Sequence, residues 1–148
     1  MTIYSILVHI HSGLRWVFLF FILATIVGSA YKLITSTGQG KCCNVMNRFT
    51  LTFTHLQLLL GLILYFISPK VIFESSSMKD SLLRFFLVEH IGLMLIAVAL
   101  ITIGYFRAKQ KTEDLKRYKT LLIYYSIALL IILAAIPWPF RELGAAWF

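Results

Sequence analysis

Four long runs of apolar residues, separated by shorter polar segments, dominate the pattern along this chain. The runs cover approximately residues 3–31, 45–67, 82–105 and 120–136. Each is close to the roughly 20 residues that an apolar helix needs to cross the hydrocarbon core of a bilayer. Pro69 and Pro137 follow the second and fourth runs, and proline is incompatible with a continuing helix. The pattern therefore predicts an all-α integral membrane protein, a four-helix up-down bundle with residues 1–148 as a single transmembrane domain.

Composition supports this prediction. Of the 148 residues, 59% are hydrophobic and only 14% are charged, whereas a soluble domain carries about 25% charged residues. Four spans leave no room for a soluble catalytic domain. The net charge of +8 is a signal of nucleic-acid binding in a soluble protein, but in a membrane protein it is typical of cytoplasmic loops. We therefore expect the lipid bilayer as a partner and no nucleic acid.

The basic residues also predict an orientation. Nine Lys and Arg residues lie on the side that the chain reaches after the first and third runs, and five lie on the other side. By the positive-inside rule the first side is cytoplasmic. We therefore expect a multi-pass protein of a bacterial inner membrane, with both termini on the periplasmic side. Cys42 and Cys43 would then be cytoplasmic thiols, and adjacent cysteines rarely bridge each other.

Ionisable side chains inside a membrane are costly and usually face the interior of a bundle. All four histidines lie in the first three runs. In the first run, one helical face carries almost all of the polar side chains, and its positions recur at steps of three and four. That stripe is His11, Arg15, Phe18, Ile22, Thr25 and Ser29. His9 points elsewhere. The second run carries two neighbouring stripes, one containing His55 and the other containing Thr50, Thr54, Gln57 and Gly61. We expect His11, His55 and His90 to face inward.

Inward histidines on different helices are the ligands that a haem in a four-helix bundle requires. Two of His11, His55 and His90 would bind the haem iron. His11 and His90 would pair across the bundle diagonal, and His55 and His90 would pair between neighbouring helices. Arg15, one turn from His11, could meet a haem propionate or Glu89. Glu89, next to His90, could orient an imidazole or carry a proton.

The residues leave other interpretations open. The histidines could simply hydrogen-bond across helices, or they could form a quinone or proton site. A zinc site built from three membrane histidines would lack the Cys or Asp that usually accompanies them. Because the sequence contains no C-x-x-C-H segment, covalent c-type haem attachment is excluded.

Four segments of the chain resemble a family of small four-span bacterial membrane proteins labelled "cytochrome B". They are HSGLRW at 11–16, HLQLLLG at 55–61, the pair Glu89-His90, and IPWPFR at 136–141. The resemblance runs along the whole chain and implies haem b and membrane electron transfer. The chain also looks like one half of a haem A synthase, although that enzyme's Glu-x-x-x-His spacing is absent because Glu89 directly precedes His90.

Residues and resemblance together predict a membrane b-type cytochrome, an electron carrier rather than a turnover enzyme. It would exchange electrons with a quinone or with a redox partner protein of a respiratory complex. The alternatives are a cofactor-free structural or assembly subunit of a membrane complex, and a haem-processing membrane enzyme. The bundle could act as a homo-oligomer or as a subunit of a larger complex.

Overall fold

The computed structural model describes residues 2–36, 41–141 and 143, with only the backbone of 41–43. The side chains of Cys42 and Cys43 lie outside this description. Four long helices form the bundle; they are α1 (Ile3–Thr35), α2 (Lys41–Ile67), α4 (His90–Lys109) and α5 (Asp114–Ala135). Short α3 (Ser81–Arg84) and a π-helical turn, η2 (Phe85–Glu89), run directly into α4. Two 3-10 turns complete the described elements, η1 (Ser75–Met78) and η3 (Pro139–Arg141). The all-α prediction is confirmed.

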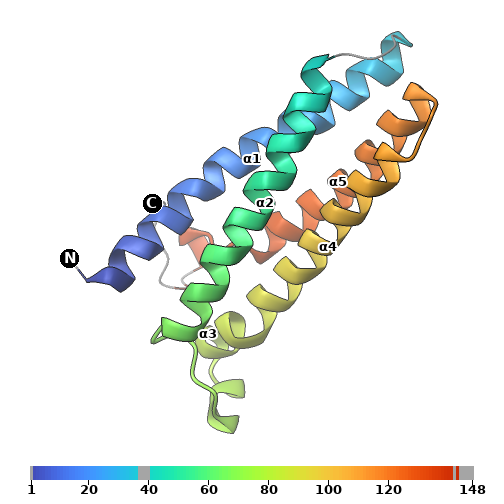
Figure 1. Cartoon of the computed structure of the whole chain (residues 1–148). Coiled ribbons are helices and arrows are strands. Elements are labelled where there is room, and N and C mark those ends of the chain that lie inside the picture. The colour runs from blue at the N-terminus through green and yellow to red at the C-terminus, as the bar shows by residue number, and fades with distance from the viewer. Residues whose placement is uncertain (1, 37–40, 142, 144–148) are drawn as a thin grey trace.

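The helices surround a common core in the predicted up-down order (Figure 1). Helix α1 packs against α2 and α5, and α4 packs against α5 and α2, so α1 and α4 lie on a diagonal. Four helical stretches are long and apolar enough to cross a membrane; they are Ile3–Thr35, Asn44–Ile67, Ser81–Lys109 and Asp114–Ala135. The chain is therefore built as a multi-pass bundle that fits lipid contact.

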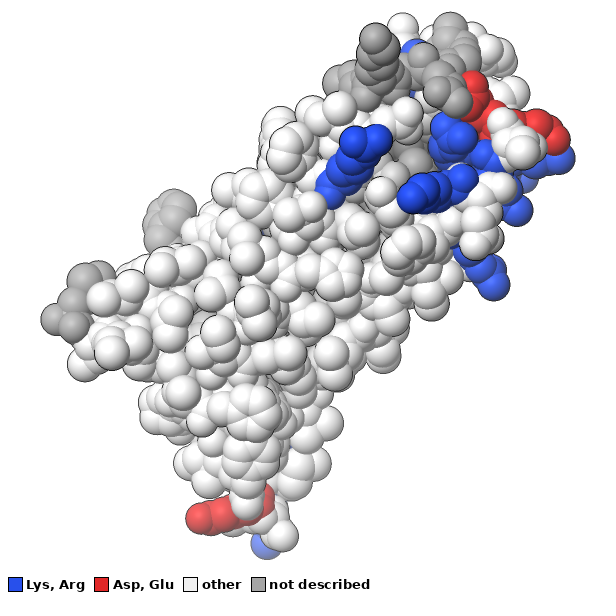
Figure 2. All heavy atoms as spheres, in the orientation of Figure 1, with Lys and Arg blue, Asp and Glu red and all other residues white. Residues whose placement is uncertain are grey.

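Charged side chains are segregated along the length of the bundle. Figure 2 shows Lys and Arg gathered at the end where α1 passes into α2 and α4 into α5, while the middle of the visible face is uncharged. The few acidic and basic groups at the opposite end lie near η1. Such a distribution leaves an uncharged band for the hydrocarbon core, because charges in lipid are costly.

Helix faces follow the expected stripe in α1, and in α2 they follow the stripe that contains Thr50 and Thr54 rather than the one that contains His55. Buried positions of α1 include Arg15, Thr25 and Ser29, which confirms the first stripe. Among the described side chains of α2, Thr50 and Thr54 are buried, and the Thr50 hydroxyl lies 2.9 Å from the hydroxyl of Thr25. This hydrogen bond joins α1 to α2 inside the core.

The expectation that His55 faces the interior is wrong. His55 is exposed. Its Nδ1 lies 2.9 Å from the carbonyl oxygen of Leu51 in its own helix, and its Nε2 lies 3.5 Å from the hydroxyl of Thr102 in α4. Neighbouring residues of a helix differ by about 100° in direction. Because the stripe of Thr50 and Thr54 faces α1, His55 lies on another face of α2, at the exposed edge of its contact with α4.

Candidate functional site

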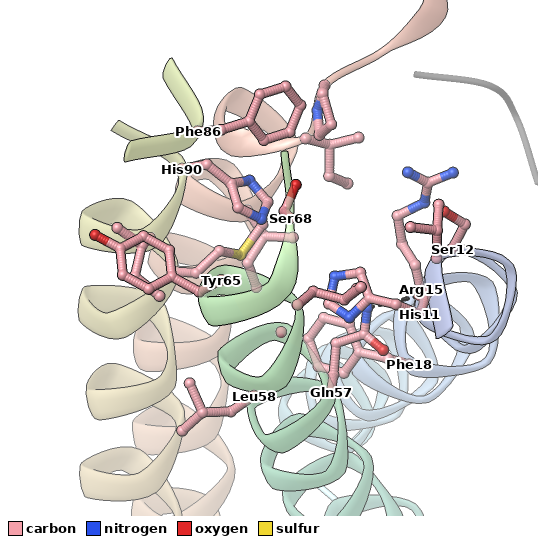
Figure 3. Close-up of a pocket in the computed structure, with 18 of the residues that line it drawn as sticks. His11, Ser12, Arg15, Phe18, Gln57, Leu58, Tyr65, Ser68, Phe86 and His90 are labelled. Carbon is pink, nitrogen blue, oxygen red and sulfur yellow. Dashed lines mark hydrogen bonds between the residues drawn. The ribbon is translucent and has the colours of Figure 1, made fainter. Parts of the chain in front are cut away.

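A cavity of about 330 Å³ lies inside the bundle, at the end where α1 and α4 begin. Its walls come from α1, α2, η2, α4 and the end of α5, and most of them are apolar. His11, Arg15, Gln57 and His90 are among the polar residues that line it (Figure 3). The volume falls within the range of small-molecule sites, which are mostly apolar with a few placed polar groups.

The ring of His90 is held in one orientation. Its Nδ1 lies 2.8 Å from the carbonyl oxygen of Ala135. A carbonyl only accepts hydrogen bonds, so Nδ1 carries the proton and Nε2 of the neutral ring keeps its lone pair. The ring also packs against Phe85 and Phe86, whose centroids lie 5.9 and 6.2 Å away. His90 thus enters the cavity with an unprotonated nitrogen available as a ligand.

The end of α5 explains why the Ala135 carbonyl is available. Residue Pro139 stands where the next intrahelical N–H would come from, and proline has none. Pro137 has the same effect on the carbonyl of Leu133, which instead accepts a 2.9 Å hydrogen bond from the indole of Trp138. Two prolines therefore free backbone carbonyls that side chains then satisfy.

A π-helical turn precedes His90 directly. The N–H of His90 bonds to the carbonyl of Phe85, five residues back. A turn of this kind interrupts the regular pattern of backbone hydrogen bonds along the helix. Within the turn, the Leu87 carbonyl accepts a 2.9 Å hydrogen bond from the hydroxyl of Tyr65. Such turns are frequent at functional sites. The turn and its contact with Tyr65 of α2 fix where His90 enters the cavity.

His11 reaches the cavity from α1 across a glycine of α2. A Cβ on Gly61 would lie 3.2 Å from the Cε1 atom of His11, so the absence of a side chain there lets the imidazole lie close to α2. Gln57 donates from Nε2 to the backbone carbonyl of His11 at 2.8 Å. Within the described part of the chain, the buried Nδ1 of His11 and Oε1 of Gln57 have no hydrogen-bond partner. The hydrogen-bonding capacity of both buried atoms is therefore unused within the described residues.

Arg15 is only 9% exposed. Its guanidinium carbon lies 5.4 Å from the ring centroid of Trp16 and 6.0 Å from that of Trp138. Glu89 does not line the cavity and instead forms a 2.9 Å ion pair with Arg84. The Ala135 carbonyl, rather than Glu89, orients the His90 imidazole.

The structure thus brings together His11, Arg15 and His90 but not His55 or Glu89. Among the described residues no group of three His, Cys, Asp or Glu side chains is arranged to hold a metal ion, which gives a three-histidine zinc site no support. Sequence reasoning missed Lys70, which also lines the cavity. The only signal for it was the neighbouring Pro69, which marks a reverse turn.

Comparison of the chain with protein-family models, with curated proteins and with solved structures finds no match. The geometry of the cavity is therefore the basis for the function proposed below.

Proposed function

We propose that the protein binds haem b between His11 and His90 and works as a b-type cytochrome, a one-electron carrier in the membrane. The observation that carries this proposal is the hydrogen bond from His90 Nδ1 to the Ala135 carbonyl. Histidines that ligate a metal commonly donate their other ring N–H to a backbone carbonyl or a carboxylate, which fixes the tautomer and the ring. His90 is prepared in this way.

The other cavity residues fit the same group. His11 comes from the helix diagonally opposite α4 and has an Nδ1 atom without a hydrogen-bond partner among the described residues. Ala97 also lines the cavity, and a small residue there favours a flat macrocycle between helices. Arg15 supplies a cation for a propionate. When bound, the haem would supply reversible one-electron redox chemistry, with its potential set by the axial ligands and the surrounding protein.

Of the two histidine pairs that the sequence allowed, the cavity favours His11 with His90. His55 is exposed and does not line it. A quinone or a respiratory complex remains our proposed electron partner, and a bacterial inner membrane with periplasmic termini remains the proposed location.

The test is an absorption spectrum of the detergent-purified protein, oxidised and then reduced with dithionite. We expect sharp Soret and α bands and nearly one haem per chain. His11→Ala and His90→Ala should each lose these bands, whereas the matched control His55→Ala should keep them. A colourless protein after haem was supplied during expression, or an unchanged spectrum in His90→Ala, would contradict the proposal.

One set of contacts favours a second candidate, a cofactor-free membrane subunit. Several buried or half-buried polar groups join different helices, such as Tyr125, whose hydroxyl donates to Asn47 Oδ1 at 2.6 Å, and Gln57 with the His11 carbonyl. In that case the histidine contacts would serve only to hold helices together. The colourless outcome of the spectroscopic test would select this candidate.

A further inference from the structure

A shallow pocket of about 240 Å³ lies at the other end of the bundle, where α4 passes into α5. Figure 2 shows that Lys and Arg gather at this end of the molecule. Three lysines line the pocket together with a threonine, an isoleucine and a tyrosine; they are Lys111, Lys116, Lys119, Thr120, Ile123 and Tyr124. None of these described lining residues is acidic. The pocket therefore combines positive charge with an apolar side.

The segment that forms this pocket is strongly basic. Between residues 107 and 119 the chain has six basic and two acidic residues. Lys116 donates from Nζ to Glu113 Oε1 at 2.7 Å, and Asp114 Oδ1 lies 3.5 Å from Arg117 Nη1. Neither acid lines the pocket. The segment therefore keeps a net positive charge, and clustered charge of one sign produces a potential that attracts the opposite sign.

The backbone that carries Lys111 is attached to both neighbouring helices. The N–H of Lys111 donates to the Ala108 carbonyl in α4 at 3.1 Å, and the Lys111 carbonyl accepts from Arg117 Nη2 in α5 at 3.1 Å. Arg107 of α4 donates from Nη1 to the Tyr124 hydroxyl at 2.6 Å, which places a further cation beside the pocket wall. The positions of these charges are thus set by hydrogen bonds between α4, α5 and their connection.

The pocket lies at the level where the uncharged part of the bundle begins. Lys119 is the last charged residue of α5, because residues 120–135 contain none. Helix α4 is likewise uncharged over residues 91–106. Tyrosine, here Tyr124, is enriched at the boundary between hydrocarbon and lipid headgroups. We therefore expect the lysines of the pocket to lie at headgroup depth when the bundle is in a membrane.

One face of α5 continues from the pocket along the apolar part of the helix. Its positions recur at steps of four and three, which places them on a single helical face; they are Lys116, Thr120, Ile123, Ile127 and Leu130. The three apolar members of this face are exposed. An acyl chain in contact with them would have its headgroup beside the lysines.

We propose that this pocket binds the phosphate group of an anionic membrane lipid through Lys111, Lys116 and Lys119, with the acyl chains along the exposed face of α5. Ammonium groups form charge-assisted hydrogen bonds with phosphate oxygens, and basic pockets beside membrane helices are typical sites for anionic headgroups. A soluble phosphate offers the same charge but has no apolar part to contact Ile123. The proposal does not depend on haem, because the pocket lies at the opposite end of the bundle from the histidine cavity.

The experiment measures lipid binding to the detergent-purified protein by native mass spectrometry, which counts the lipids on each chain. Dioleoylphosphatidylglycerol and dioleoylphosphatidylcholine are compared, because they share their acyl chains and differ in headgroup charge. We expect the first phosphatidylglycerol molecule to bind roughly tenfold more tightly than phosphatidylcholine, since each nearby lysine strengthens the attraction to an anionic lipid several-fold. Inorganic phosphate and glycerol 3-phosphate, added in large excess, should not displace it.

Variants assign the effect to the pocket. Lys111→Gln and Lys119→Gln should each weaken phosphatidylglycerol binding about fivefold, and the corresponding Lys→Arg variants should retain it. Lys109→Gln is the matched control, because it removes the same charge from the same segment but Lys109 is exposed and does not line the pocket. Equal affinity for the two lipids, binding of neither lipid, or an equal loss in Lys109→Gln would overturn the proposal. Displacement by inorganic phosphate would also overturn it, because the site would then serve a soluble anion.

Discussion

The imidazole of His90 in α4 donates a 2.8 Å hydrogen bond to the carbonyl oxygen of Ala135, the last residue of α5. One contact thereby satisfies a helix end and sets the tautomer of a candidate haem ligand. Because Ala135 is fully buried, loss of this donor would leave the carbonyl without its partner in an apolar place. The stability of the α5 end and the geometry of the cavity are consequently linked through a single ring.

His90→Phe should destabilise the haem-free protein by about 1–3 kcal/mol, the usual cost of leaving a buried polar group unpaired. His90→Gln should recover part of that loss, because an amide can still donate. The exposed control His55→Phe should change stability by no more than about 0.5 kcal/mol. Thermal unfolding in detergent measures all three, and equal stability of His90→Phe and His55→Phe would show that the contact with Ala135 contributes nothing.

Gly61→Ala should disturb the position of His11 without unfolding the bundle. The new Cβ would lie 3.2 Å from His11 Cε1, so the imidazole must move by a few tenths of an ångström. We expect a shifted Soret band and roughly tenfold weaker haem binding, since site geometry must be held to within about 0.5 Å. Gly13→Ala is the control in α1, where a Cβ meets nothing within 4 Å, and its spectrum should match the parent protein.

Gly104→Ala should separate α4 from α5. A Cβ on Gly104 would lie 2.6 Å from the Cβ of Tyr124, an atom that cannot move without the α5 backbone. Overpacking of this kind costs about 1–3 kcal/mol. Gly92→Ala, in the same helix but with open space, should be neutral. Unfolding in detergent that gave the same midpoint for both variants would contradict this close helix approach.

Tyr65→Phe should loosen the π-helical turn before His90. The substitution removes the hydroxyl that donates to the Leu87 carbonyl, at a cost of about 0.5–1.5 kcal/mol. Hydrogen exchange should rise in η2 but not in the inner half of α4, as expected for local opening. Uniform protection throughout α4 in both proteins would mean that Tyr65 does not hold the turn.

The four long helices and the diagonal placement of α1 and α4 could be predicted from the sequence, because the lengths of the apolar runs and the short connections determine both. The inward orientation of the stripe that contains His11 and Arg15 could also be predicted, because the polar side chains of that helix recur on one face. The prediction for His55 was wrong because Thr54 and His55 belong to two neighbouring stripes of the same helix. The pattern of polar residues does not decide which of these stripes faces α1. The π-helical turn and the position of Lys70 at the cavity were not predicted. Both depend on backbone hydrogen-bond register or turn conformation, which the hydropathy pattern does not reveal.

The carbonyl that orients His90 belongs to residue 135, near the end of the last span. During synthesis, α1, α2 and α4 are made before α5. When these three helices are complete, His11 and His90 are both present, but the Ala135 carbonyl that orients His90 has not yet been made. The contact between His90 and Ala135 therefore forms only after α5 has been made. If the protein binds haem as proposed, a chain that ends before α5 would carry both histidines but lack the carbonyl that orients His90.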